Sequence, residues 1–422
     1  MTTVEAAERA LAAPRRWRGG EKIADRTIAV LIFLSGFVIV EPAPYDVAMV
    51  LVVIIGSFFG LSFNRYTLPM TLLLIAYVAG GFLGFTQIDD FAGPLLYMMT
   101  TAFLAVSAMF YASVIVANPV HRLALIRNAY IFSALIVATI GILAYFGLFP
   151  DADYFKLYDR AKGTFQDPNV FAPFLALPAA FLARDVLTRR LRESAWEIAG
   201  LLLILFAIFL SFSRAAWGMT IFSLLVVAYL AFATAPRQLA RFRLVAYLTA
   251  GGVAVTLMIA AAISLPSVHN LFEERAQVVQ SYDDSATGRF ERQKAGFFLI
   301  QEKPFGIGPF EFAKRFTEDE HNMWLKGFTV YGWLGGFAYI ALVAWTLAAA
   351  APLLFKPRPW QAMVQCTYAV YLGHIMIHNV IDNDHWRHLF LMYGILWGAI
   401  AAEKMQKHGW RIADAAVAPA AT

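Results

Sequence analysis

Residues 288–336 read GRFERQKAGFFLIQEKPFGIGPFEFAKRFTEDEHNMWLKGFTVYGWLGG, a basic and polar stretch that stands between apolar runs. The chain of 422 residues is 60% hydrophobic and 15% charged, whereas an average soluble domain is about 25% charged. Apolar runs of about 20 residues recur with short polar breaks, the pattern of a polytopic helical membrane protein. Barrel strands would alternate and be about 10 residues long. The sequence therefore predicts an all-α membrane protein whose polar stretch carries the function.

Twelve transmembrane helices are expected, because lipid offers the backbone of a spanning segment no other hydrogen-bond partners. Their expected ranges are 27–41, 45–63, 68–87, 93–117, 123–149, 169–184, 196–212, 215–234, 245–265, 322–352, 361–381 and 386–402. They form one transmembrane domain, residues 27–402, between a basic tail at 1–26 and a second tail at 403–422.

The distribution of Lys and Arg predicts the orientation of these helices. The basic breaks between spans, from Arg65 to Lys356–Arg358, fall on the same side as both tails. The hairpins EPAPY and QIDD on the other side contain neither Lys nor Arg. Because cytoplasmic loops carry the excess of positive charge, both termini are expected in the cytoplasm, and the net charge of +5 is no sign of nucleic-acid binding.

Two long loops then lie on the outer side, at 150–168 and at 266–320. The second is the large loop between spans 9 and 10. Both loops contain several Lys and Arg residues, against the usual preference for positive charge on the cytoplasmic side. Binding of an anion at the outer face of the membrane would explain this charge.

The first outer loop, DADYFKLYDRAKGTFQDPN, offers Arg160 and Lys162 as ligands for such an anion. It ends in Asp167-Pro168, a common helix start in which Asp caps the helix and Pro occupies the first turn. That structural role is the favoured interpretation of Asp167.

Arg214 lies in the turn SFSRAAWG, between two apolar runs with almost no loop around it. Placing a charged residue at the centre of a membrane helix costs about 2.5–3.5 kcal/mol of insertion free energy on translocon-insertion scales, which give the lowest estimates. Extension of the side chain to the lipid headgroups is one interpretation. An inward-facing anion ligand is favoured, because Ser211 and Ser213 make the turn polar as well.

In the second outer loop, a helix is expected from Ser285 to Glu302, with Pro304 as its end. Arg289 and Arg292 share one face of this helix, although a solvated basic face is the alternative. The following PFGIGPF is a turn, and its single G-x-G is too weak a signal for a phosphate loop.

A further polar set surrounds the last two spans. His374 and His378 are one helical turn apart, and Asp382-Asn383-Asp384 follows. Histidines at this spacing can bind a metal ion, but spacing alone is weak evidence. A hydrogen-bonding network is favoured, so no metal ligand is assigned.

Arg214, Arg289 and His321 together suit transfer of a glycan from a lipid diphosphate to a hydroxyl. Arginine binds phosphate through several hydrogen bonds and is permanently charged, so two arginines could stabilise a diphosphate leaving group in place of a metal ion. A histidine can accept the proton of an acceptor hydroxyl. Glu320 or Asp319, beside His321, could orient the imidazole ring, although adjacent residues on a helix point apart. Arg160, Lys162, Arg292 and Asn322 are the expected substrate-binding residues.

Several of these stretches resemble the O-antigen ligase and polymerase superfamily of bacterial inner-membrane proteins. They are SFSRAAWG at 211–218, GRFERQKAGFFLIQEKPFGIGPFEF at 288–312, HNMWLKGFTVYGWLGG at 321–336 and DPN at 167–169. They are similar to the family's Ser-Arg turn, its Arg-containing segment with a Pro-Gly-x-Gly loop, its His-Asn span and the entry to an earlier span. The resemblance covers roughly residues 160–345.

The resemblance implies metal-independent, inverting glycosyl transfer on the periplasmic face of the bacterial inner membrane, with no cofactor. The donor would be a glycan on undecaprenyl diphosphate. Arg214 and Arg289 would hold the diphosphate, and His321 would be the base. The cluster from Asp382 to His388 acquires no role from the resemblance, and neither does Arg292.

Two acceptors fit this reaction. Lipid A–core is the acceptor of a ligase, and a second lipid-linked glycan is the acceptor of a polymerase. The ligase is slightly favoured, because one dominant outer loop bears Arg289 and leads to His321. A 12-span transporter or flippase is the alternative from another class. It is disfavoured because the two halves of the chain do not resemble each other and the charges cluster at outer helix ends.

Overall fold

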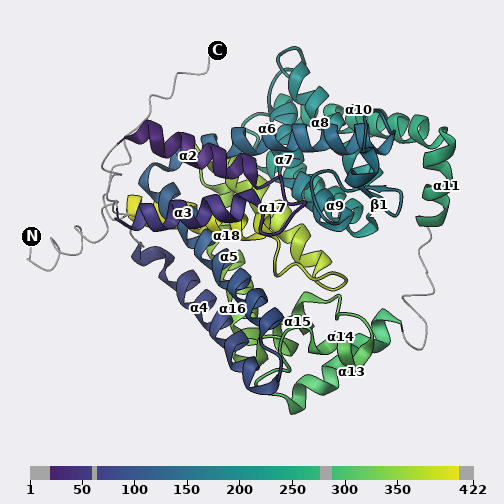
Figure 1. Ribbon diagram of the computed structural model, residues 1–422. Helices are drawn as coiled ribbons and strands as arrows, with labels where there is room; N and C mark the ends of the chain where they lie inside the picture. Colours follow the sequence, from purple (N-terminus) through teal and green to yellow (C-terminus); the bar gives the residue numbers. More distant parts are fainter. Residues whose placement is uncertain (1–19, 59–63, 276–287, 408–422) are drawn as a thin grey trace, which may run out of the picture.

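The computed structural model describes residues 20–58, 64–275 and 288–407, which are predominantly helical (Figure 1). Within these residues, seven helical segments are long and apolar enough to cross a membrane, and two shorter apolar helices accompany them. The helical membrane-protein class is therefore confirmed. Each of the twelve expected ranges contains helix, but the count of twelve membrane crossings stays a prediction.

The α-helices are α2 Glu21–Leu34, α3 Pro44–Phe58, α4 Leu68–Leu83, α5 Ala92–Ala117, α6 Pro119–Tyr145, α7 Pro168–Thr188, α8 Ala195–Leu210, α9 Arg214–Ala233, α10 Gln238–Ile263, α11 Pro266–Arg275, α13 Arg289–Glu302, α14 Glu311–Phe316, α15 Met323–Thr329, α16 Gly332–Ala350, α17 Gln361–Ile377 and α18 Arg387–Lys407. Short 3₁₀ helices are η1 Arg65–Thr67, η2 Gly84–Gln87, η3 Ala152–Phe155, η4 Leu191–Glu193 and η5 Ala351–Phe355. One two-stranded hairpin, β1 Lys156–Leu157 and β2 Arg160–Ala161, interrupts the all-α fold.

The core lies where α5, α7, α17 and α18 pack together. α18 runs along α5, and α17 lies against both α9 and α7. The most apolar part of α7 is 78% buried, whereas that of α10 is only 6% buried. The outward side chains of α10, such as Val253 and Leu257, are apolar. An exposed apolar surface of this kind belongs against lipid, so α10 has the properties of a lipid-facing helix.

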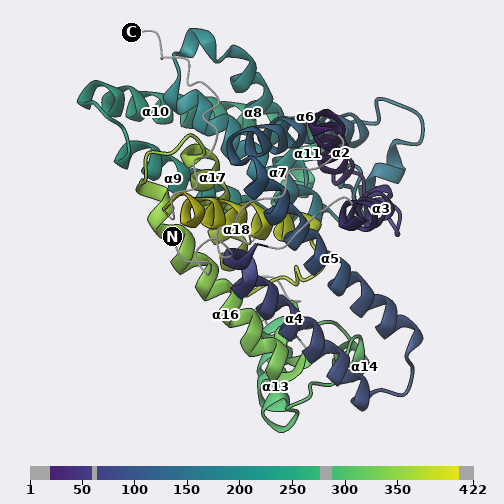
Figure 2. The same cartoon turned by 90° about the vertical axis from the view of Figure 1, so that its left-hand side faces the viewer.

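A second group of elements extends from this bundle. α4 and α16 lie side by side and reach away from the bundle towards α13, α14 and α15 (Figure 1 and Figure 2). Hydrogen bonds from Trp333 N to Pro304 O (2.8 Å) and from Ile307 N to Thr329 O (2.6 Å) join the PFGIGPF turn to this group. The polar stretch therefore packs on the ends of helices and is not a separate domain.

The prediction of one continuous helix at 322–352 is wrong. This range contains two helices, α15 and α16. The chain bends at Gly332, whose φ is +63°. A Cβ at this position would lie 2.8 Å from the carbonyl oxygen of Pro304, and one at Gly306 would lie 2.9 Å from the Gly332 nitrogen. The two glycines let the turn and the bend approach each other, a contact that apolar periodicity does not reveal.

We expect Gly332→Ala to destabilise the protein. The left-handed backbone alone costs a non-glycine residue about 1–2 kcal/mol, and the close carbonyl adds a steric clash. Thermal unfolding of the purified protein in detergent should show a lower midpoint. Gly252→Ala in α10 is the matched control, because no atom lies within 4 Å of its added Cβ and alanine suits a helix better than glycine. Equal midpoints for Gly332→Ala and wild type would contradict the account of the bend.

Candidate functional site

His321 and Asn322 form a sharp turn before α15. His321 has a left-handed backbone with φ +46°, and the Asn322 side chain caps α15. The Asn322 backbone N–H donates to Asp382 Oδ1 at 2.9 Å, and Met323 N donates to His378 O at 2.7 Å. The end of α17 and the loop that follows it therefore hold the turn in place.

The imidazole of His321 is 39% exposed, with Nδ1 3.9 Å from Asp382 Oδ2. That separation exceeds a hydrogen bond but lies within the range of strong electrostatic interaction. The expectation that Glu320 orients the ring is wrong. Glu320 is 1% exposed and accepts a hydrogen bond from Thr329 Oγ1 at 2.5 Å. The left-handed turn directs the two neighbouring side chains apart, and Asp382 is the carboxylate beside the histidine.

α13 packs on this turn through Gln293. Its Nε2 donates to the carbonyl oxygens of His321 at 3.1 Å and Asn379 at 3.4 Å, and Asn322 Nδ2 donates to its Oε1 at 3.4 Å. Arg289, the first residue of α13, precedes Gln293 by four residues and so shares its helix face. The structure therefore brings the face of α13 that carries Arg289 onto the His321 turn.

Arg292 lies on an adjoining part of α13 and is buried, at 9% exposure. Its Nη2 forms an ion pair with Glu318 Oε2. This pair joins α13 to the segment that leads into the turn. In the structure Arg292 therefore has a structural contact. Its expected contact with substrate stays a prediction.

Arg214 is the first residue of α9, directly after Ser213, whose side chain caps the helix. The preceding turn is attached to the start of α7 by Arg160. Arg160 is 8% exposed, and its guanidinium donates to Ser211 O at 2.7 Å and to Asn169 Oδ1 at 2.9 Å. The structure therefore brings Arg160 to the turn that positions Arg214, with part of its hydrogen-bonding capacity used by protein.

Lys162 follows Arg160 by two residues. Its ammonium lies 5.5 Å from the ring centroid of Tyr154, a side chain that is itself 54% exposed.

The structural interpretation of Asp167 is confirmed, because Asp167 caps α7 by accepting a hydrogen bond from Asn169 N at 2.6 Å. The end of α13 before Pro304 is also confirmed, whereas residues 285–287 of its expected start lie outside the described residues.

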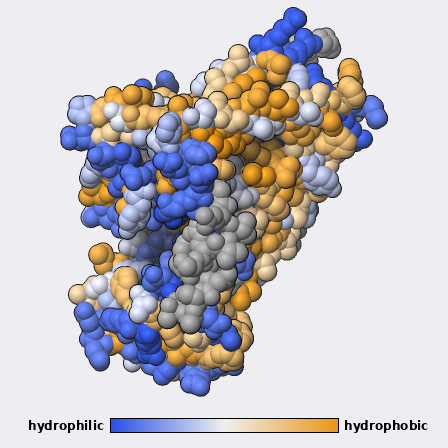
Figure 3. Space-filling model, turned by 90° about the vertical axis from the view of Figure 1, so that its right-hand side faces the viewer, coloured by the Kyte–Doolittle hydropathy of each residue, from blue (hydrophilic) through white to orange (hydrophobic). Residues whose placement is uncertain are grey.

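The end of α17 connects the Arg214 region with the His321 turn. α17 packs along α9, and Met376 Cε lies 3.9 Å from a Cβ built at Gly218. Asn379, which follows Met376 by less than one turn, accepts the hydrogen bonds of Gln293 and Asn322 described above. Figure 1 shows the loop after α17 extending between α9 and α15, and Figure 3 shows a hollow on this side with hydrophilic residues on its walls.

A polar cluster packs against the turn, and it includes Asp382 and Asp384 of the expected hydrogen-bonding network; its partners Lys326, Tyr331 and Tyr97 were not expected. Lys326 Nζ lies 3.4 Å from Asp382 Oδ2. Asp384 accepts hydrogen bonds from Tyr331 at 2.9 Å and from Tyr97. The available signals were a lysine inside an apolar helix and two aspartates directly after a span, since charges at such depth need partners.

The histidines of the last two spans take part in hydrogen bonds with their surroundings. His388 Nε2 lies 3.2 Å from His374 Nε2, and His374 Nδ1 lies 2.9 Å from Val370 O. His378 Nε2 instead lies 3.4 Å from Tyr339 Oη. Across residues 20–58, 64–275 and 288–407, no group of three or more His, Cys, Asp or Glu could hold a metal ion.

Glu320 provides a pH test of this cluster. Burial raises the pKa of Glu320 to about 7, with the Asp382 charge adding to the effect and Lys326 opposing it. The folded protein therefore keeps a proton that the unfolded chain loses near pH 4.5, and stability falls as pH rises between about 4.5 and 7.

We expect Glu320→Gln to gain stability relative to wild type by up to roughly 3 kcal/mol as pH rises through this window. Thermal midpoints of both proteins measured from pH 5 to pH 8 check this. Glu302→Gln, at an exposed position of α13, is the matched control. A constant difference between Glu320→Gln and wild type across that range would rule out the protonated carboxyl.

Comparison with known families matches part of the chain. Residues 199–340 match the family model described as O-antigen ligase. The matched segment covers about a third of the chain and includes Arg214, Arg289, Arg292 and His321. No curated protein and no solved structure matches the chain. The resemblance to the O-antigen ligase and polymerase superfamily is thus confirmed, and it rests on the elements that build the site.

Proposed function

We propose that this protein transfers a glycan from an undecaprenyl-diphosphate donor to an acceptor hydroxyl at the periplasmic face of the bacterial inner membrane, with both termini in the cytoplasm. The observation that carries the proposal is the docking of α13 on the His321 turn. Gln293 contacts the turn directly, and Arg289 lies on the same helix face. The end of α17 contacts that turn through Asn379, and α17 packs along α9, whose first residue is Arg214.

His321 acts as the general base. Its half-exposed imidazole accepts the proton of the acceptor hydroxyl as the oxygen attacks the anomeric carbon of the donor glycan. Proton transfer by a positioned side chain typically contributes 10²–10⁴-fold to a rate. The carboxylate of Asp382, 3.9 Å from Nδ1, stabilises the imidazolium that forms.

The bond between the anomeric carbon and the diphosphate oxygen breaks in the same step, with inversion at that carbon. The electron pair stays on the diphosphate, and its negative charge develops between Arg214 and Arg289. Guanidinium groups suit this role because they bind phosphate oxygens in pairs. The two arginines supply the charge stabilisation that a divalent cation provides elsewhere, so the reaction is metal-independent. Asn322, Arg160, Lys162 and Arg292 contribute to substrate binding around this centre.

The acceptor that we favour is lipid A–core, which makes the protein an O-antigen ligase. The polymerase of the same superfamily, with a second lipid-linked glycan as acceptor, is the alternative. The choice can be tested with one donor and two acceptors supplied separately to the purified protein. Exclusive use of the second lipid-linked glycan would overturn the ligase assignment and leave the donor chemistry intact.

Removal of any one of the three central side chains should strongly slow transfer. We expect Arg214→Ala and Arg289→Ala each to lower the turnover number by roughly 10²–10³-fold, the effect of losing one group that stabilises transition-state charge. His321→Ala should lower it by roughly 10²–10⁴-fold. The measurement is product formation from a purified undecaprenyl-diphosphate glycan in the presence of a chelator.

Arg315→Ala is the matched control for the arginine variants, because Arg315 lies exposed in the same outer loop. Its activity should equal that of wild type. Full activity of all three site variants would remove the proposed site. Loss of wild-type activity in chelator, with recovery on adding a divalent cation, would overturn the metal-independent reaction.

Asp382 is expected to act as a positioning residue. Asp382→Ala removes the acceptor that holds the Asn322 backbone, so the turnover number should fall by roughly tenfold or more while the KM for the donor changes little. Asp382→Asn retains an oxygen acceptor and should recover part of this loss. A rise in the donor KM with unchanged turnover would instead indicate a binding role and contradict the positioning role.

A further inference from the structure

α13 exposes an aromatic surface beside the face that packs on the His321 turn. Phe290 is 49% exposed, Phe297 58% and Phe298 60%. Phe290 and Phe297 are seven residues apart and therefore share one face of the helix, and the rings of Phe297 and Phe298 lie 5.9 Å apart between centroids. We call these three residues the aromatic surface of α13. An exposed apolar patch on a polar segment indicates an interaction site.

The last turn of α13 is hydrogen-bonded to the start of a membrane span. α16 begins a segment, Gly332–Phe355, that is long and apolar enough to cross a membrane, and Trp333 is its second residue. Trp333 Nε1 donates to Ile300 O at 2.8 Å, and its backbone N–H donates to Pro304 O, also at 2.8 Å. The last turn of α13 therefore lies at the depth where this span begins.

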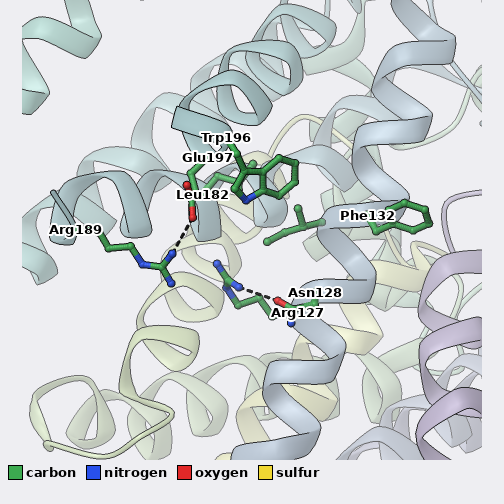
Figure 4. A pocket seen from close by; sticks show the side chains of 8 residues that line it. Arg127, Asn128, Phe132, Leu182, Arg189, Trp196 and Glu197 are labelled. Atoms are coloured by element: carbon green, nitrogen blue, oxygen red, sulfur yellow. Dashed lines mark hydrogen bonds and ion pairs between the residues drawn. The ribbon is translucent and has the colours of Figure 1, made fainter. Parts of the chain in front are cut away.

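Trp333 indicates that this depth is the level of the lipid headgroups, where tryptophan is enriched. A second tryptophan occupies the same position in another apolar helix, because Trp196 is the second residue of α8 and is 57% exposed. Figure 4 shows Trp196 next to Glu197, which forms an ion pair with Arg189. Exposed tryptophans thus mark the ends of apolar helices at which charged groups begin.

The aromatic surface adjoins the apolar surface that α16 presents to lipid. Trp333, Phe337 and Ile340 are 43%, 59% and 41% exposed, and their spacing of i, i+4 and i+7 places them on one face of α16. An exposed apolar face on a membrane span belongs against lipid. Phe297 precedes Ile300, the hydrogen-bond partner of Trp333, by about one helical turn. The lipid in contact with α16 is therefore the nearest apolar phase for the aromatic surface.

The charged residues of α13 are arranged as in a helix that lies in a membrane interface. Lys294 lies between Phe290 and Phe297 on one side of the helix, whereas Glu291 and Glu302, eleven residues apart, share another side. The stem of a lysine can lie along an apolar surface while the ammonium stays among the headgroups. The exposed ion pair of Lys294 with Glu291, at 3.7 Å, is of a kind that contributes little. Aromatic and basic residues together, with carboxylates on another side, favour a lipid surface as the partner.

We propose that α13 is an interfacial helix whose aromatic surface lies in the boundary between headgroups and acyl chains, in the leaflet where α16 begins. Phe290, Phe297 and Phe298 contact the lipid, and Lys294 reaches the headgroups. The bilayer and the His321 turn then hold α13 from two sides. The proposal does not rest on the transfer reaction.

Spin labelling tests this position in the full-length protein, reconstituted in nanodiscs of phosphatidylcholine and phosphatidylglycerol. The single cysteine, Cys366, is buried and is replaced by alanine in every variant. Phe297→Cys then carries a nitroxide. Electron paramagnetic resonance compares its collisions with molecular oxygen, which concentrates in lipid, and with a water-soluble nickel chelate. Leu257→Cys on the lipid-facing α10 is the lipid reference, and Glu302→Cys is the matched control on the acidic side of α13.

We expect the oxygen-to-nickel collision ratio of Phe297→Cys to be shifted from the value of Glu302→Cys towards that of Leu257→Cys. Equal ratios for Phe297→Cys and Glu302→Cys would overturn the proposal. Low collision rates of Phe297→Cys with both reagents would show that protein, such as a second copy of this chain, covers the surface, and would also overturn it. Phe290→Cys, with the same expected shift, replaces Phe297→Cys if that variant does not fold.

Discussion

The carboxylate of Asp382 is the group on which the candidate site depends. One oxygen accepts the backbone N–H of Asn322, and the other faces both Lys326 and His321. Asp382 belongs to the loop after α17, so this carboxylate ties the His321 turn to the part of the bundle that packs against α9. A buried charge is tolerated only where it is paired and hydrogen-bonded. The pair with Lys326 therefore keeps the turn in one position.

This arrangement places a charged site at the ends of apolar helices. The helices satisfy their own backbone hydrogen bonds and expose apolar side chains to lipid, which α10 does along most of its length. The polar side chains meet where α7, α9, α15, α17 and α18 begin or end. α13 packs against this region through the hydrogen bonds of Gln293 and the Arg292–Glu318 ion pair. An apolar helical scaffold thus carries a polar site at the ends of its helices.

Local patterns predicted much of this structure. Apolar runs located the helices, Asp167-Pro168 marked the start of α7, and Pro304 marked the end of α13, because each depends on neighbouring residues alone. The break between α15 and α16 could not be predicted, since it depends on the contact of Gly332 with the distant Pro304. Arg214, Arg289 and His321 were proposed from charge in an apolar context and from family resemblance. Asp382 was not assigned to the site, because its partners lie 60 and 56 residues away in the chain.

The central claim is that Arg214 and Arg289 hold one diphosphate beside His321. The most direct measurement is an experimental structure of the protein in lipid nanodiscs with a polyprenyl diphosphate bound. The account predicts that both guanidinium groups contact the diphosphate and that the His321 imidazole faces the oxygen that would carry the glycan. A diphosphate bound elsewhere, or bound by neither arginine, would contradict it.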